Sequence, residues 1–176
     1  GETRDLETAE IAIRASLTGH LVLSTLHTND AAGVVPRLVD MGVEPYLLAS
    51  CLKGSLAQRL LRRLCPKCAA PTKPAPAAIA ALGEFGVRVG EKEVKAPRGC
   101  PACLEGYKGR TGIFELMIVG DRMQEAIRNK RYSSGDIRTL ARQAGMTGIL
   151  ENGLAKALEG VTSLEEVISV VNPAAE

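Results

Sequence analysis

Four of the five cysteines fall into two pairs, CPKC at 65–68 and CPAC at 100–103. Each pair can place two sulfurs on one tight turn, and two such turns together supply four thiolates, the tetrahedral ligand set that Zn²⁺ prefers. The alternative interpretations are two disulfides, a thiol redox pair or four ordinary cysteines. The spacing favours a structural zinc site whose ligands are Cys65, Cys68, Cys100 and Cys103. Such a site is closed, because four protein ligands leave no open position on the metal.

The segment between the pairs, residues 69–99, is longer than the roughly 15–20 residues of a common zinc ribbon, so it is expected to carry structure of its own. It begins with a Pro/Ala-rich linker, followed by a short helix and a polar, hairpin-like stretch. The fifth cysteine, Cys51, lies among leucines and is interpreted as a buried structural thiol.

The two histidines, His20 and His27, bracket the apolar stretch HLVLSTL (20–26). As a strand buried on both faces of a parallel sheet, this stretch would hold them about 23 Å apart, at about 3.3 Å per residue, so they cannot share one metal ion. His27 then follows the carboxyl end of the strand, where open α/β sheets bind ligands. Glu2 would hold the same place after a preceding strand.

A glutamate at this edge can orient or deprotonate a water molecule, and a histidine can hydrogen-bond a terminal phosphate oxygen. The residues Glu2 and His27 therefore suit phosphoryl transfer to water. The alternative is that His27 has no catalytic role, as is common for a histidine in a polar loop. Arg4 would then be a surface or interface charge. No G-x-x-x-x-G-K-[ST] motif occurs, so a nucleotide site here is expected to be partial. The basic cluster RLLRR with Lys67 could contact phosphate or nucleic acid. The commoner alternative is a strip of charges that faces solvent or a neighbouring subunit.

The surrounding patterns predict an α/β fold. Asp5 is placed to cap a helix over 6–17, and Thr28 and Asn29 are cap-type residues ahead of a helix that ends at Gly42. Further helices are predicted from Pro45 and over 121–130, 134–144, 147–159 and 163–171, the last with Thr162 and Glu165 as a capping box. Residues 55–64, which also fit a helix, and RTGIFELMIV (110–119) are interpreted as strands.

The bulk composition sets limits on function. The net charge of +2 gives no support to a nucleic-acid partner, and no apolar run approaches the roughly 18–20 residues that span a bilayer. Paired cysteines in a metal pattern indicate a reducing compartment, which predicts a soluble, cytoplasmic protein.

Seven motifs follow one another along the chain: GETRD, HLVLSTLHTND, MGVEP, AQRLLRRLCPKC, CPAC, GYKGRTGIFEL and TSLEEV. With these motifs in this order, the chain resembles the C-terminal half of a type II secretion traffic ATPase of the GspE family. Close relatives, the PilB proteins, drive type IV pilus extension. The resemblance runs from residue 1 to about 171. It implies that a P-loop, a Walker B strand, arginine fingers and an N-terminal domain lie upstream, and that the isolated chain neither binds ATP tightly nor hydrolyses it.

The resemblance also implies residue roles. Glu2 matches the Walker B glutamate that activates the attacking water, and residues 20–27 match the family's His box, whose catalytic candidates are His20 and, better placed, His27. Arg4 and Arg110 are implied near the nucleotide, ATP with Mg²⁺, and the four cysteines match the family's zinc module. Thr3 stands where an aliphatic residue is usual.

The implied fold class is α/β: the C-terminal part of a RecA-like P-loop NTPase domain with an inserted tetracysteine zinc lobe and a helical C-terminal subdomain. The expected domains are the RecA-like core (1–64), the zinc lobe (65–103), a return strand (104–120) and a helical subdomain (121–176). The parent is implied to be a homo-hexamer on the cytoplasmic face of the bacterial inner membrane, bound to platform proteins and only indirectly to the membrane. It would drive pseudopilus assembly in secretion; the alternatives are a type IV pilus extension ATPase, a non-catalytic zinc docking module and a nucleic-acid-binding zinc ribbon.

Overall fold

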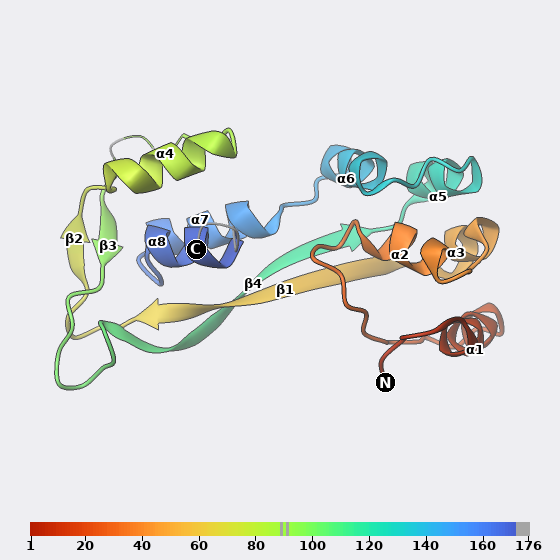
Figure 1. Ribbon diagram of the computed structural model, residues 1–176, viewed down its shortest axis with the longest axis horizontal. Coiled ribbons are helices and arrows are strands. Elements are labelled where there is room, and N and C mark those ends of the chain that lie inside the picture. Colours follow the sequence, from red (N-terminus) through yellow and green to blue (C-terminus); the bar gives the residue numbers. More distant parts are fainter. Residues whose placement is uncertain (89, 91, 172–176) are drawn as a thin grey trace. The chain divides into compact units, whose positions relative to one another are not determined.

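Two long strands, β1 (Gly54–Leu64) and β4 (Tyr107–Ile118), pair in a two-stranded sheet and run in opposite directions (Figure 1). The structure, a computed structural model, describes residues 1–88, 90 and 92–171. Its backbone forms two compact units, one of Gly1–Ala57 and Glu115–Thr147 and one of Gln58–Phe114 and Gly148–Glu176. The four domains expected from the sequence divide the chain differently and, as functional divisions, stay predictions.

The first unit is built from helices: α1 (Leu6–Leu17), α2 (Val34–Asp40), α3 (Pro45–Cys51), α5 (Asp121–Arg128) and α6 (Ser134–Gln143). Asp5 caps α1, because its Oδ1 accepts a hydrogen bond from the Thr8 amide at 2.8 Å, and this bond lowers the pKa of the Asp5 carboxyl. Helix α1 packs on α3, α3 on α5, and α2 on α6. Together they bury Ile13, Val35 and Leu48.

The second unit contains two short antiparallel strands, β2 (Ala70–Thr72) and β3 (Val94–Ala96), and the helices α4 (Pro76–Glu84), α7 (Ile149–Leu158) and α8 (Leu164–Val171). Ala70 lies opposite Ala96 in the β2–β3 pair. Helix α7 packs on α8, and a Cβ added to Gly153 would lie 2.8 Å from a methyl of Val167. The helices therefore approach too closely there for any larger residue.

Most predicted elements are confirmed: the capped helix over 6–17, the helix from Pro45, the strands β1 and β4, and the four C-terminal helices. Residues 69–99 differ in detail, because part of the expected linker forms β2 and the helix lies between β2 and β3. Helix α2 begins at Val34, and Asp30, not Thr28 or Asn29, accepts a hydrogen bond from the Gly33 amide just before it.

The predicted strand over 20–26 is wrong. Only an isolated parallel bridge between Glu2 and Thr25 forms there, and the side chains of Leu21 and Leu23 are 84% and 83% exposed. A strand buried on both faces needs partner strands and covering elements. Within the described residues, the segment around Glu2 is the partner that pairs with it.

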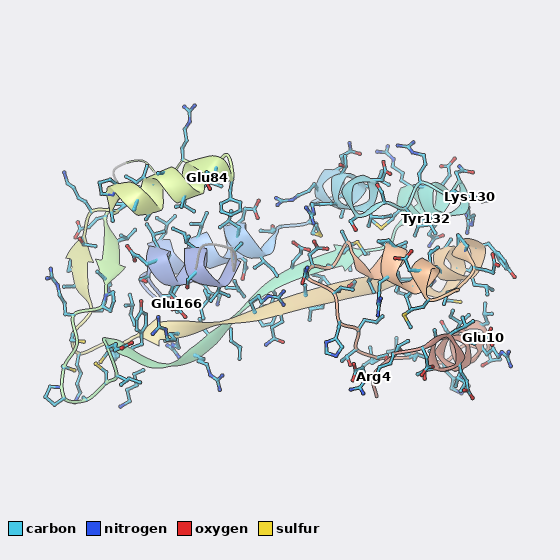
Figure 2. The ribbon with its side chains drawn as sticks, in the orientation of Figure 1. Arg4, Glu10, Glu84, Lys130, Tyr132 and Glu166 are labelled. Atoms are coloured by element: carbon cyan, nitrogen blue, oxygen red, sulfur yellow. The ribbon has the colours of Figure 1, made fainter. Side chains whose placement is uncertain are left out.

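The predicted capping box before α8 is shifted by one residue. Ser163, not Thr162, accepts the hydrogen bond from the Glu166 amide, at 3.2 Å, while the Thr162 hydroxyl donates to the Arg62 carbonyl at 2.8 Å. The Glu166 carboxylate, labelled in Figure 2, accepts hydrogen bonds from the Arg62 backbone amide and from Nε of its side chain, both at 2.8 Å. The guanidinium also lies 4.2 Å from the centre of the Tyr107 ring, so one arginine links β1, β4 and α8.

We predict that Glu166→Ala lowers the free energy of unfolding by about 1–3 kcal/mol, because it removes buried hydrogen bonds to a charged group. Urea unfolding followed by circular dichroism measures the change. The matched control is Glu165→Ala, which removes the adjacent exposed carboxylate of the same helix. Equal unfolding midpoints for the two variants would contradict the structural role of the Arg62–Glu166 pair.

Candidate functional site

The four paired cysteines form a tight cluster in the second unit. All four Sγ atoms lie within 4.8 Å of one another, with separations of 3.9 Å for Cys65–Cys100, 3.7 Å for Cys68–Cys103 and 3.6 Å for Cys100–Cys103. A zinc ion with four Zn–S bonds of about 2.3 Å requires tetrahedral edges of about 3.8 Å. The cluster therefore fits a closed tetrathiolate zinc site, and the five cysteines form no disulfide.

Backbone hydrogen bonds hold the two cysteine turns together. The Cys65 amide, directly after β1, donates to the Gly106 carbonyl at 2.8 Å, and each pair closes its own turn through the amides of Cys68 and Cys103. Gly106 has a φ of +85°, and a Cβ there would lie 2.4 Å from the Pro97 ring. Glycine is required at this position both by its backbone conformation and by this close approach.

The thiols perturb one another strongly. Burial alone would raise the pKa of Cys103, but backbone hydrogen bonds and the neighbouring Cys100 and Cys68 lower it to about 7. Burial and hydrogen bonds to the other thiols raise the pKa of Cys68 to about 11. Four thiolates cannot coexist at this spacing without a cation, and a divalent ion would supply the missing positive charge.

We predict that the wild-type chain binds one zinc ion and that Cys68→Ser loses most of it, with a fall in the melting temperature of at least about 5 °C. Metal analysis after dialysis and thermal unfolding measure both effects. Cys51→Ser is the matched control, because its sulfur lies 4.0 Å from the Ile13 carbonyl in the first unit and is not part of the cluster. Full zinc binding by Cys68→Ser would contradict the assignment.

The first unit brings Glu2, Arg4 and His27 together. One oxygen of the Glu2 carboxylate lies 2.6 Å from an Arg4 guanidinium nitrogen, and the other, Oε1, lies 2.6 Å from Nε2 of His27. The Glu2 side chain is 25% exposed, whereas the His27 side chain is 87% exposed. Oε1 is buried against His27, and a carboxylate oxygen has lone pairs enough to accept a second hydrogen bond as well.

The backbone around Glu2 positions this cluster. Thr3 is buried, its amide donates to the Thr25 carbonyl at 2.9 Å, and its hydroxyl lies 2.8 Å from that of Ser24. Successive residues of extended chain point to opposite sides, so Glu2 and Arg4 emerge on the side away from Thr3. The Thr3 hydroxyl therefore contributes a hydrogen bond to this pairing.

The electrostatics of the cluster favour an ionised carboxylate. The Arg4 guanidinium holds the pKa of Glu2 below its ordinary value against a smaller opposing effect of burial, and the contact with His27 acts in the same direction as Arg4. Glu2 in turn raises the pKa of Arg4. A carboxylate with a lowered pKa is a weak proton acceptor but a good acceptor of a hydrogen bond from water, so orientation of a water molecule suits it best.

The other predicted site residues lie elsewhere. His20 follows the end of α1, where its Nδ1 contacts the Thr18 hydroxyl at 3.1 Å and the Ala15 carbonyl at 3.2 Å. The two histidines thus have different surroundings, although the strand that was expected to separate them does not form. Arg110 is exposed on β4 within the second unit. The catalytic and nucleotide-binding roles of these residues stay predictions.

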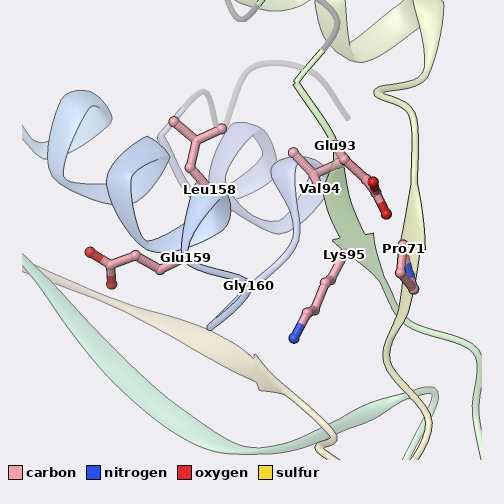
Figure 3. Close-up of a pocket in the computed structure, with 7 residues that line it drawn as sticks. All are labelled: Pro71, Glu93, Val94, Lys95, Leu158, Glu159 and Gly160. Carbon is pink, nitrogen blue, oxygen red and sulfur yellow. The ribbon is translucent and has the colours of Figure 1, made fainter.

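The predicted basic cluster is divided between two environments. Arg62 is engaged by Glu166, with Glu105 a further 3.4 Å contact. Arg63 lines a hollow of about 490 Å³ with Lys95 and Lys108. A neighbouring hollow of about 170 Å³ lies between β2, β3 and the end of α7, and Figure 3 shows Lys95 extending along it beside Gly160.

Sequence reasoning missed three polar residues that hold the segment after His27. Glu115 is 6% exposed and accepts a hydrogen bond from the Ala31 amide, and Asp30 pairs with Arg138 of α6. A signal for Glu115 was present: within the alternating strand GIFELM it occupies an inward position, between the buried Ile113 and Met117. A lone carboxylate at such a position indicates a buried hydrogen-bond acceptor.

We predict that Arg4→Ala raises the pKa of the Glu2 carboxyl towards that of an unpaired glutamate, because its main stabilising partner is lost. Because the folded-state pKa of Glu2 is lowered, its contribution to stability is present above the unfolded pKa and is lost as pH falls through the folded pKa. Carbon-detected NMR titration of the side chain measures the change. Arg14→Ala, which removes the exposed partner of Glu10, is the control and leaves the Glu2 titration unchanged. An identical Glu2 titration in Arg4→Ala would contradict the pairing.

Comparison with solved structures defines the class of the fold. The crystal structure of the pilus retraction motor PilT with bound ADP matches this chain with a TM-score of 0.60 and 25% identity. The match covers 95% of this chain and 37% of the PilT chain. The ATPase DotB of Legionella pneumophila matches with a TM-score of 0.62 at 19% identity, which supports the fold alone. The chain therefore has a mixed α/β fold shared with motor ATPases.

The chain belongs to the type II/IV secretion system protein family, whose model matches residues 1–169. It is 51% identical over 171 residues to type II secretion system protein E of Pseudomonas aeruginosa. This match covers 97% of this chain and 33% of that protein. It is 47% identical to the type IV pilus assembly ATPase PilB of Thermus thermophilus, covering 96% of this chain and 19% of PilB. The chain thus spans about a third or less of these relatives.

The family-level expectation from the sequence is confirmed, and the mixed α/β class with it. Among the described residues, no helix has the length and apolar character needed to cross a membrane.

Proposed function

We propose that this chain carries the water-activating carboxylate and the structural zinc lobe of a motor ATPase that couples ATP hydrolysis to pseudopilus assembly in type II secretion. The observation that carries the proposal is the Glu2 carboxylate held between Arg4 and His27. Membership of the secretion family supports it.

In the proposed reaction, Oε1 of Glu2 accepts a hydrogen bond from a water molecule whose oxygen attacks the γ-phosphorus of ATP. The bond between this phosphorus and the bridging oxygen breaks, ADP leaves, and the water proton passes to Glu2 or to a phosphate oxygen. The exposed imidazole of His27 hydrogen-bonds a γ-phosphate oxygen and so senses whether the third phosphate is present. Mg²⁺ would supply charge neutralisation at the phosphates.

His20, Arg4 and Arg110 have lesser proposed roles. Arg4 holds the Glu2 carboxylate ionised and in place, and Arg110 is proposed to approach the nucleotide in the assembled motor. His20 is assigned to the His box by resemblance. The motor is proposed to be a homo-hexamer with a RecA-like core at the cytoplasmic face of the inner membrane, bound to platform proteins of the secretion system.

The zinc lobe is proposed to be structural. Its four thiolates would hold the ion with no position left for substrate, so the metal would fix the two cysteine turns and the β1–β4 ends that carry them. It takes no part in the hydrolytic step.

Two alternatives remain open to test. The 47% identity to PilB favours a type IV pilus extension ATPase as the second candidate, with the same chemistry and a different assembly. The tetracysteine geometry also suits a non-catalytic docking module. In that case, a Cys65→Ser/Cys68→Ser variant would lose partner binding while hydrolysing ATP normally.

We predict that Glu2→Gln in the complete protein that carries this sequence lowers kcat for ATP by about 100-fold or more, because the amide cannot orient the attacking water through a negative oxygen. Phosphate release measures turnover, and fluorescent nucleotide binding measures affinity, which is expected to be retained. The matched control is Glu10→Gln on the exposed face of α1. Wild-type turnover by Glu2→Gln would remove Glu2 from the reaction.

The isolated chain is proposed to be inactive, because its sequence contains no Gly-Lys-Ser/Thr loop to hold the phosphates. Micromolar ATP binding by the 176 residues alone would contradict this proposal.

A further inference from the structure

We infer that Glu115, together with Arg138, positions the loop that carries His27 and is a positioning residue for the hydrolysis proposed above, on which this inference rests. The His27 loop is defined as residues 26–33. It runs from the Thr25 bridge to the start of α2, and its two ends are held by different parts of the first unit.

The first anchor is the pairing with the Glu2 segment. Thr25 forms the parallel bridge with Glu2, and its carbonyl accepts the Thr3 amide at 2.9 Å. The Ser24 hydroxyl adds a contact to the Thr3 hydroxyl at 2.8 Å. This end of the loop therefore moves with the candidate catalytic carboxylate.

The second anchor is Glu115 on β4. Its Oε1 accepts a hydrogen bond from the Ala31 amide at 2.9 Å, and both residues are buried, at 6% and 1% exposure. The neighbouring Ala32 is completely buried. A strand carboxylate thus replaces the backbone partner that the loop lacks at this point, inside the protein where an unpaired amide would be unfavourable.

Asp30 extends this anchor to helix α6. One carboxylate oxygen accepts the Gly33 amide at 2.8 Å, and the other pairs with the Arg138 guanidinium. The Asp30 carbonyl also accepts the Thr28 hydroxyl at 2.9 Å, which tightens the turn directly after His27. The loop is therefore braced against both β4 and α6.

The short span between the anchors makes His27 sensitive to the second one. Only residues 26–30 separate Thr25 from Ala31, and each spans at most about 3.6 Å. Release of Ala31 would let the imidazole move away from Glu2, and misplacement by about 1 Å can reduce a reaction rate about 100-fold. Glutamine at 115 keeps the acceptor oxygen, whereas alanine removes it.

Amide hydrogen exchange in this chain tests the restraint directly. Glu115→Ala is expected to accelerate exchange of the Ala31 amide by at least about tenfold, while Glu115→Gln stays within about twofold of wild type. The buried Ala49 amide in α3 is the internal reference, and Glu125→Ala, an exposed carboxylate of α5, is the matched control. Unchanged Ala31 exchange in a folded Glu115→Ala chain would overturn the inference.

Steady-state kinetics in the complete protein test the consequence. Glu115→Ala is expected to lower kcat by about 10- to 100-fold with KM for ATP within about threefold, and Glu115→Gln to recover most of kcat. If Glu115 only stabilised the fold, kcat in Glu115→Gln would recover only as far as the stability of the protein recovers. Wild-type kcat in Glu115→Ala, or a Glu115→Gln as slow as Glu115→Ala, would overturn the inference.

Two further variants keep the test decisive. If Glu115→Ala does not fold, Arg138→Ala removes the half-exposed partner of Asp30 and is expected to lower kcat about three- to tenfold, with recovery by Arg138→Lys; an unchanged kcat overturns the inference. Glu2→Gln, measured in parallel, separates the two proposals. A fast Glu2→Gln with a slow Glu115→Ala rejects the role of Glu2, whereas the reverse pattern rejects the role of Glu115.

Discussion

The pairing of Glu2 with Thr25 is the constraint on which the candidate site depends. One parallel bridge, with the Thr3 amide bound to the Thr25 carbonyl, brings together two segments that the whole of α1 separates in sequence. This pairing puts the Glu2 carboxylate beside His27, and Arg4, two residues along the same extended segment, reaches the other carboxylate oxygen. The three side chains form a compact charged cluster only because the backbone aligns them.

Charge neutralisation follows the same logic in the second unit. Glu166 is nearly buried and is compensated by Arg62, whose guanidinium also stacks on Tyr107. The four clustered cysteines, two just after β1 and two shortly before β4, would carry an excess of negative charge as thiolates, which a zinc ion would balance. In both places, residues on or next to the ends of the long β1 and β4 strands take part, so this strand pair organises the second unit.

The sequence predicted the elements with strong local signals. These signals depend on neighbours in the sequence: the Asp5 cap, Pro45 at the first turn of α3, and the apolar periodicity of the C-terminal helices. The spacing within each cysteine pair is a local signal of the same kind. Predictions failed where more distant partners decide, as two examples show. Residues 20–26 have the composition of a buried strand, but in the described part of the chain they pair through the single Thr25–Glu2 bridge. Ser163 displaced Thr162 as the helix cap because the Thr162 hydroxyl bonds to Arg62. The support of the His27 loop by Glu115 and Arg138 was missed for the same reason, since both lie far along the chain.

A structure of the complete protein with Mg²⁺ and a non-hydrolysable ATP analogue would test the proposed role of Glu2 and His27. We expect a water molecule in line with the γ-phosphorus, about 2.6–3.2 Å from the Glu2 carboxylate, and the His27 imidazole on a γ-phosphate oxygen. A nucleotide bound with Glu2 and His27 still turned to each other, and with neither near the γ-phosphate or its water, would contradict the proposed catalytic cluster.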